Sequence, residues 1–272
     1  MDAIFEKFYL HALTATAVAQ AAAKGANTPV ILVPLGSHED HGPHLPMGDY
    51  RLADRLAGQI AARAAHQGVN ALVAPTVPYG VADYFATSPG AMALSPASFK
   101  AVLEDLLGGL IAQGFTRIVI LNGHGGNVPV IHTVTLALKT SRDIIVPSFY
   151  LWKIARVIME RQLGGGAANR FGHGAEPLAS LSLALRPGLS DFQPVPARAG
   201  GFELGLPVSG FGTVNFAGLP VDVPSQFHQA PDDAICAAAP LASAALGEAV
   251  AAELVAAAAS FVVHFAKVTS AC

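Results

Sequence analysis

The sequence has 272 residues, of which 52% are hydrophobic and 13% are charged, and its formal net charge is -3. This balance excludes an extended disordered protein, and the lack of a basic stripe argues against nucleic acid as a partner. No linker-like change of composition divides the chain, so we predict a single domain over residues 1–272.

Cysteine usage and the N-terminus indicate a cytoplasmic protein. The two cysteines, Cys236 and Cys272, lie far apart in the sequence, which is typical of reduced, incidental thiols. Residues 1–7 carry acids among apolar side chains and lack the basic-then-apolar order of a signal peptide.

The apolar stretch at residues 234–263 is the segment that most resembles a membrane span. It contains Pro240, Glu248 and Glu253, and much of its apolar content is alanine. This pattern favours a helix packed on a sheet or on a neighbouring subunit. We therefore predict no membrane partner.

Helices and strands alternate along the chain. A helix capped by Thr14 or Thr16 is predicted to end near Gly25, and a buried strand follows. Apolar periodicity predicts strands at 29–35, 71–77, 117–121 and 144–149, and helices at 51–65, 96–112, 128–138 and 178–185. The alternation predicts an α/β fold, a three-layer α/β/α domain with a mostly parallel central sheet.

A dense group of potential metal ligands follows the first predicted strand. Open α/β sheets place ligands just beyond the carboxyl ends of their strands, where this group emerges. Imidazole and carboxylate together suit zinc or manganese, and sometimes iron. The alternative is a polar loop with solvated histidines. The potential ligands are His38, Glu39, Asp40, His41, His44 and Asp49.

Two further segments carry histidines beside glycines. Residues 122–127 follow the predicted third strand and present His124; the loop lacks the Walker lysine and the dinucleotide-binding spacing. His124 becomes a ligand candidate because metals recruit ligands from separate loops. In residues 171–177, His173 and Glu176 are three apart and can converge on one point. Alternatively, Glu176 complements a helix dipole and His173 is solvated.

Residues 39–46, 122–127 and 173–176 together resemble the creatininase (creatinine amidohydrolase) family in order and spacing, over roughly residues 14–187. The resemblance implies a dinuclear amidohydrolase acting on small cyclic amides, lactam-like or creatinine-like. It implies two divalent ions, zinc first, with manganese or iron as alternatives. The family also includes a formamide hydrolase and a peptidase that trims a peptide-derived redox cofactor. Members commonly form homo-oligomers, often hexamers.

The resemblance also implies roles for individual residues. Glu39 and His124 match ligands of one metal, His41 matches a ligand of the other, and Asp49 stands for the aspartate that bridges both. Glu176 completes the second metal and belongs with His173 to the catalytic pair, in which His173 transfers a proton or stabilises an oxyanion. The implied metal ligands are therefore Glu39, His41, Asp49, His124 and Glu176.

Three departures from the family pattern bear on the site. The bridging aspartate normally sits one residue further on, where this chain has Tyr50, so Asp49 must reach from a shifted loop; Asp54 is a remoter substitute. Asp40 replaces the usual glutamine. The usual Glu-Thr-Ser after the third block is Leu-Ala-Ser at residues 178–180. We therefore expect a substrate other than creatinine.

The expected chemistry is attack on an amide carbonyl by a hydroxide that bridges the two metals, with one metal polarising the carbonyl oxygen. Two other classes of function remain open. One is an isomerase or lyase that uses the same ligands to stabilise an enolate. The other is a metal-binding protein without catalysis, which the shifted Asp49 favours.

The walls of the substrate pocket are less well defined by the sequence. Binding sites are often lined by aromatic side chains, so the candidates for the pocket walls are Tyr84, Phe85, Phe149 and Trp152. Core packing is an equal alternative for each of them. The glycine- and proline-rich residues 200–224 form either a lid or a subunit contact.

Overall fold

The computed structural model describes residues 4–23, 25, 28–167, 169–192, 200–231 and 239–269. Its centre is a four-stranded sheet in the order β2-β1-β3-β4, and all three strand pairs are parallel. The strands are β1 (Val30–Leu35), β2 (Ala71–Val73), β3 (Ile118–Asn122) and β4 (Ser148–Tyr150). The predicted parallel sheet is confirmed.

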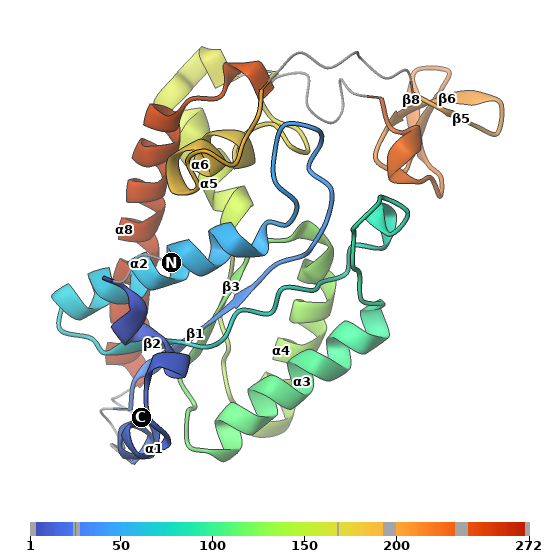
Figure 1. The fold of residues 1–272 in the computed structure, drawn as a ribbon. Coiled ribbons are helices and arrows are strands. Elements are labelled where there is room, and N and C mark those ends of the chain that lie inside the picture. Colours follow the sequence, from blue (N-terminus) through green and yellow to red (C-terminus); the bar gives the residue numbers. More distant parts are fainter. Residues whose placement is uncertain are drawn as a thin grey trace.

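Helices cover both faces of this sheet, so the predicted three-layer α/β fold is also confirmed (Figure 1). Side chains alternate along a strand. Leu32 and Leu121 accordingly pack on one face, and Ile31 and Ile118 pack on the other. The first face is covered by α2 (Tyr50–His66), α5 (Leu151–Leu163), α6 (Leu178–Leu185) and α8 (Ala244–Thr269). The second is covered by α1 (Ala15–Ala22), α3 (Pro96–Ala112) and α4 (Val128–Arg142).

Helix starts follow the capping residues in the sequence. Thr14, rather than Thr16, caps α1 and accepts a hydrogen bond from the Ala17 N–H at 3.2 Å. Ser95 caps α3 by accepting from the Ser98 N–H at 3.2 Å, with proline at the first helical position. Short 3-10 turns complete the described helices: η1 (Glu6–Phe8), η2 (Leu10–Ala12), η4 (Asp83–Phe85), η5 (Gly125–Asn127), η6 (Gly164–Ala167), η7 (Phe227–Gln229) and η8 (Ala239–Leu241).

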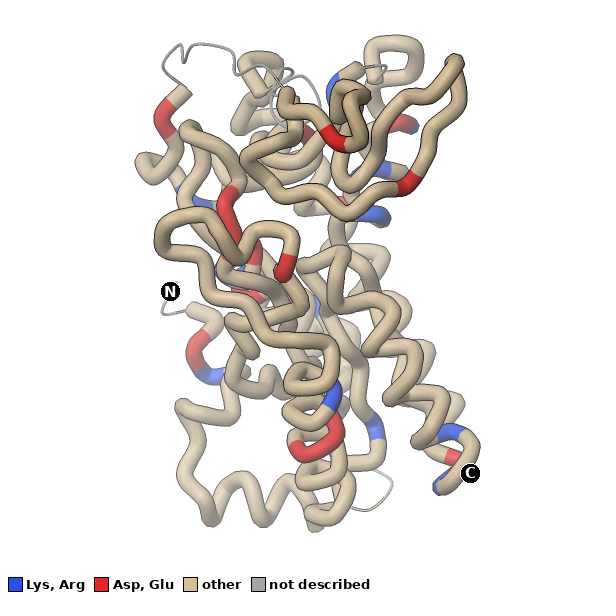
Figure 2. The backbone as a smooth tube through the Cα atoms, turned by 90° about the vertical axis from the view of Figure 1, so that its right-hand side faces the viewer, with Lys and Arg blue, Asp and Glu red and all other residues tan. Residues whose placement is uncertain are grey.

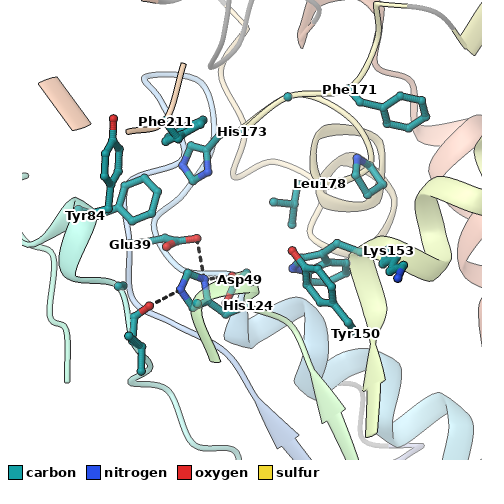
Figure 3. Close-up of a pocket in the computed structure, with 18 of the residues that line it drawn as sticks. Glu39, Asp49, Tyr84, His124, Tyr150, Lys153, Phe171, His173, Leu178 and Phe211 are labelled. Atoms are coloured by element: carbon teal, nitrogen blue, oxygen red, sulfur yellow. Dashed lines mark hydrogen bonds and ion pairs between the residues drawn. The ribbon is translucent and has the colours of Figure 1, made fainter. Parts of the chain in front are cut away.

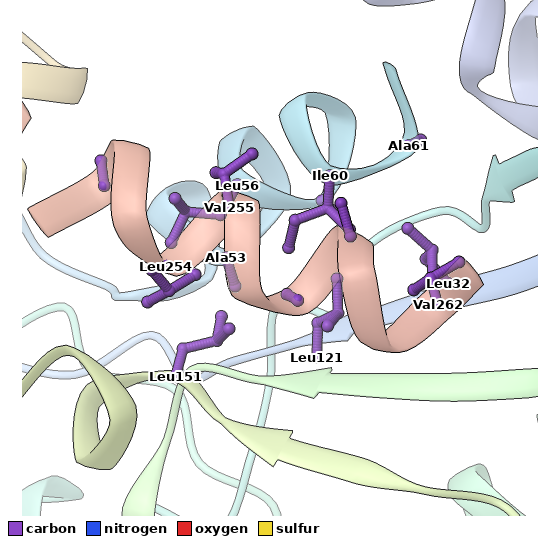
Figure 4. Packing of buried hydrophobic residues seen from close by; sticks show 14 of the residues in the cluster. Leu32, Ala53, Leu56, Ile60, Ala61, Leu121, Leu151, Leu254, Val255 and Val262 are labelled. Atoms are coloured by element: carbon purple, nitrogen blue, oxygen red, sulfur yellow. The ribbon is translucent and has the colours of Figure 1, made fainter. Parts of the chain in front are cut away.

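The C-terminal helix α8 belongs to the core of the domain. By length and composition alone it could cross a membrane, with a mean hydropathy of 1.8 over its most apolar window. In the fold, 56% of that window is buried, and α8 packs against α2, α5 and α6. Figure 4 shows Leu254, Val255 and Val262 of α8 among side chains of α2 and the sheet. This arrangement agrees with the prediction of a helix packed inside the protein.

A second, antiparallel sheet lies at one end of the domain, beyond the carboxyl edge of the parallel sheet (Figure 1). It was not expected from the sequence, although it falls within the glycine- and proline-rich residues 200–224. Its strands are β5 (Phe202–Glu203), β6 (Leu206–Gly210), β7 (Thr213–Phe216) and β8 (Leu219–Asp222). A view at right angles shows charged positions sparsely scattered along the chain (Figure 2).

Two predicted strands had wrong boundaries, and one helix was missed. β2 ends at Val73, well before the predicted residue 77. β4 occupies Ser148–Tyr150 and not residues 144–149. The helix α5, which follows β4 directly, was missed, although its buried positions recur at helical spacing. Cys236 and Cys272, which were predicted to be reduced thiols, lie outside the described residues.

Candidate metal centre

The ends of β1 and β3 bring the predicted ligands together. These two strands are neighbours in a parallel sheet, so their carboxyl ends lie side by side. The loop after β1 carries Glu39, His41 and Asp49, and His124 follows β3 directly. All four side chains are buried, at 2–6% relative exposure. Charged groups are rarely buried this deeply unless they are paired or bind a metal.

Glu39 is the common member of two candidate ligand groups. One group joins Glu39, Asp49 and His124, the other joins Glu39, His41 and His173, and the ligand atoms of each group lie within 4.8 Å of one another. Glu39 Oε1 lies 3.1 Å from His124 Nδ1 and 3.1 Å from His41 Nε2. His124 Nδ1 also lies 3.4 Å from Asp49 Oδ2 (Figure 3).

Two atoms that could bind a metal are buried and have no hydrogen-bond partner among the described residues. They are Glu39 Oε2 and His41 Nε2. An unsatisfied buried polar group costs about 1–3 kcal/mol, and more for a charged one. A cation held between carboxylate and imidazole would satisfy both atoms at once. The donor set of carboxylates and imidazoles therefore fits a divalent metal such as zinc.

The hydrogen bonds around these ligands orient them for metal binding. His124 Nε2 lies 2.8 Å from the Val81 carbonyl, which can only accept, so Nε2 carries the proton. A metal that displaced the Nδ1 proton would therefore meet an Nδ1 lone pair facing Glu39 and Asp49. Such a backbone contact to the second ring nitrogen is typical of metal-bound histidines. Asp49 is fixed in turn by the Ser37 N–H, which donates to its Oδ1 at 2.7 Å.

The protonation of the buried ligands reflects their crowding. Burial alone would raise the pKa of Glu39, but the charge and hydrogen bond of His124, together with the charge of the nearby His41, hold that pKa well below its usual range. Burial raises the pKa of Asp49, with a further contribution from the nearby Glu39 carboxylate. Two adjacent buried carboxylates repel each other, and bound cations would relieve that repulsion.

The third block places His173 directly beside the ligand groups. Its Nε2 donates to the Asp40 carbonyl at 2.5 Å, and its ring stacks on His41 at 4.9 Å and on Phe85 at 4.5 Å. Burial, followed by the charge of His41, lowers the pKa of His173 to about 4. The alternative of a solvated His173 is therefore wrong, and the imidazole is neutral near pH 7.

Glu176 is held differently. Its side chain is 1% exposed and lines a cavity beside the ligand groups, but it belongs to neither ligand group among the described residues. Its carboxylate accepts hydrogen bonds from Ser180 Oγ at 2.5 Å and from the Ser180 N–H at 3.2 Å, at the start of α6. These contacts match the alternative in which Glu176 interacts with the start of a helix. Its assignment as a metal ligand stays a prediction.

The shifted loop still delivers Asp49 to the site. The remoter substitute, Asp54, accepts a hydrogen bond from Thr76 Oγ1 at 2.6 Å and belongs to neither ligand group of the described residues. Of the two aspartates, only Asp49 contacts His124.

A cavity of about 750 Å³ opens beside the ligand groups. Three of the predicted wall residues, Tyr84, Phe85 and Trp152, line it. Phe149 does not line this cavity: its ring packs against Phe261 of α8 at 5.1 Å, which is the core-packing alternative. The Trp152 indole N–H donates to the carbonyl of Gly123.

Other wall residues were missed in the sequence. Tyr150, Lys153 and Arg156 come from β4 and α5, and could have been found from the amphipathic spacing of α5. Phe211 comes from the antiparallel sheet, and its ring lies 5.1 Å from Tyr84 and 5.3 Å from His173. No local sequence signal shows where this sheet docks.

Comparison with known proteins agrees with this geometry. The family model described as "Creatininase: Creatinine amidohydrolase" matches residues 11–262. The chain belongs to the creatininase family. A creatininase structure described as "Creatininase Mn" superposes with a TM-score of 0.72 at 24% identity, covering 93% of this chain and 96% of that chain. This likeness to creatininase confirms the fold.

Relatives within the creatininase family differ in what they act on. The "Mycofactocin precursor peptide peptidase" of Mycolicibacterium smegmatis is 37% identical over 41% of this chain and 45% of its own length. The "3-dehydro-scyllo-inosose hydrolase" of Thermotoga maritima is 31% identical over 58% of this chain and 50% of its own length. The "Creatinine amidohydrolase" of Pseudomonas putida is 29% identical over 61% of this chain and 68% of its own length. The chain spans about half the length of the first two of these relatives.

Proposed function

We propose that this chain is a metal-dependent amidohydrolase that hydrolyses a C–N amide bond in a small molecule. The observation that carries the proposal is the pair of ligand groups sharing Glu39, in which Glu39 Oε2 and His41 Nε2 are buried without hydrogen-bond partners. The substrate we favour is a small cyclic amide, lactam-like or creatinine-like, because the family model is that of creatinine amidohydrolase.

Two divalent ions per chain fit the residues present. Glu39, Asp49 and His124 would hold one ion, and His41 would hold the second, with Glu176 completing it. Zinc suits this donor set best, with manganese or iron as alternatives. Related creatininase structures are described as "Creatininase Mn" and as "Zn-Zn type". When bound, such ions supply Lewis-acid activation of water and of the amide carbonyl.

The side chains around the ions would handle protons and exclude solvent. His173 is neutral near pH 7, and its Nε2 proton is engaged by the Asp40 carbonyl, which leaves the Nδ1 lone pair free. His173 Nδ1 can accept a proton from the attacking water and deliver it to the leaving nitrogen. Phe85 stacks on His173 and Phe211 meets its ring edge-on, and the two rings would restrict the access of water to this step.

A peptidase of the same family is the second candidate. The relative with 37% identity is a peptide peptidase, and a cavity of about 750 Å³ has room for a peptide end. The cyclic amide and the peptide differ in size and not in the bond broken. No contact in the described part of the site favours a formamide hydrolase or a metal-binding protein without catalysis.

We also propose a homo-oligomer in the cytoplasm, with a hexamer as the favoured assembly. Large apolar side chains are exposed on the antiparallel sheet, where Phe202, Leu204 and Leu219 are 66–84% exposed. Such a surface is compatible with a subunit contact.

Metal content is the first test. Protein purified without chelator should carry about two equivalents of zinc, manganese or iron by mass spectrometry. Glu39→Ala and His41→Ala should lower the metal content and abolish activity on a panel of lactams, cyclic ureides, formamides and short peptides. His132→Ala, an exposed position on α4, is the matched control. Absence of metal after reconstitution would overturn the proposal, and full occupancy in both variants would overturn the ligand assignment.

A further inference from the structure

Two cations lie on one wall of the cavity. Lys153 and Arg156 both line it, and they are three residues apart on α5, so they share one face of the helix. In Figure 3, Lys153 lies across the cavity from Tyr84, on the side of Phe171. In a chain with only 13% charged residues, two cations on one wall set the chemistry of that wall.

The two cations are available to a ligand in different ways. The guanidinium of Arg156 lies over the Phe171 ring, 4.5 Å from its centroid, and its Nε donates to Glu160 at 2.8 Å. These contacts orient Arg156 and leave both terminal NH2 groups for another acceptor. Lys153 is exposed and forms no ion pair or hydrogen bond within the described part of the chain, so its Nζ is free to move.

The acids of the cavity do not neutralise this wall. Glu39 and Asp49 face the histidines of the ligand groups. Glu176 is engaged by Ser180. Asp83, which lines the cavity from η4, accepts from the N–H of its neighbour Tyr84. Glu160, outside the cavity lining, pairs with Arg156, so the wall keeps the positive charge of Lys153 and the free NH2 groups of Arg156 for an anionic group of the ligand.

We propose that the amide substrate carries a carboxylate, which Lys153 and Arg156 bind while the scissile amide lies at the metal end of the cavity. This inference rests on the proposed amidohydrolase function. It narrows the substrate class from small amides in general to acidic amides. Arg156 would take the carboxylate in a planar, two-pronged contact, and Lys153 would contribute a mobile point charge.

Matched substrate pairs test the inference. Each pair differs only in the carboxylate: dihydroorotate against dihydrouracil, and acetyl-alanyl-tyrosine against its C-terminal carboxamide. Wild-type protein should prefer the acidic member of at least one pair by about tenfold or more in kcat/KM. Lys153→Met and Arg156→Met should each reduce that preference severalfold, chiefly through a higher KM for the acidic member. Lys267→Met removes the same charge from an exposed position on α8 and is the control.

A binding measurement keeps the inference separate from catalysis. Metal-loaded protein is titrated with dicarboxylates from succinate to suberate, each against the monocarboxylate of equal chain length. At least one dicarboxylate should bind about tenfold more tightly than its partner, and Lys153→Met should abolish that difference. Equal binding of the two series, or a difference that Lys153→Met and Lys267→Met change alike, would overturn the inference. Loss of amide hydrolysis with this discrimination intact would overturn the proposed function alone.

Discussion

Replacing Gly126 by alanine should disturb the metal centre through a single backbone carbonyl. A Cβ atom on Gly126 would lie 2.0 Å from Val81 O and 2.8 Å from His124 Nε2. Carbon and carbonyl oxygen approach to roughly 3.3 Å, so Val81 has to move by about 1 Å. Val81 is held at both ends, because its N–H donates to Asn127 Oδ1 at 2.9 Å and its carbonyl accepts from His124 at 2.8 Å.

The magnitude follows from these contacts. Overpacking a well-filled site costs about 1–3 kcal/mol, and a lost hydrogen bond adds about 1 kcal/mol. We therefore expect Gly126→Ala to lose about 3 kcal/mol of unfolding free energy, or roughly 6–12 °C in Tm. Release of His124 from Val81 should also weaken zinc binding by about 10–100-fold, the usual effect of losing such an orienting contact.

Urea unfolding of the metal-free protein measures the first effect, and competition with a zinc chelator measures the second. Gly108→Ala is the matched control, because a Cβ there meets nothing within 4 Å in the helix α3. That control should gain up to about 1 kcal/mol. If Gly126→Ala were as stable as wild type and bound zinc equally well, the Val81 carbonyl could not be what orients His124.

Three further outcomes are expected. Asp49→Asn should lower the metal content, while Asp54→Asn should leave it unchanged, as measured by mass spectrometry; equal loss in both would contradict the assignment. Ser180→Ala should cost about 1–3 kcal/mol in urea unfolding, because the buried Glu176 carboxylate loses its hydroxyl donor, whereas Ser141→Ala on exposed α4 should be near neutral. Burial, then nearby carboxylates, raises the pKa of Tyr150 to about 12, so the unfolded chain loses this proton first. Stability should therefore fall as pH rises from about 10 to 12, and a Tyr150→Phe variant without a smaller fall would refute this.

The sheet and the ligand groups could be predicted because they depend on local signals. The runs of apolar residues in β1 and β3 have no polar alternation, so they read as strands buried on both faces. The histidines and acids that follow each run then meet at one sheet edge. Glu39, His41, Asp49 and His124 were found this way, and the structure brings them together.

The cavity walls could not be predicted to the same degree, because they depend on register and on long-range docking. β4 begins at Ser148, so successive side chains point to opposite faces: Phe149 packs on α8, and Tyr150 reaches the cavity. The sequence left both core packing and the cavity wall open for Phe149, and Tyr150 was missed. Phe211 arrives from a separate sheet, and the pattern of its own strands says nothing about His173, which it contacts.

The shortened loop explains why ligand spacing alone is a poor guide to the bridging aspartate. Asp49 is held by the Ser37 N–H at the end of β1, at 2.7 Å, and not by its place in the helix α2 that follows. The chain returns so closely that a Cβ on Gly36 would lie 2.4 Å from the Tyr50 Cα and 2.6 Å from Asp49 Oδ1. A glycine at the strand end thus lets the loop bring the Asp49 carboxylate to 3.4 Å from His124 Nδ1. The strand end fixes the ligand position, and the loop length has only to reach it.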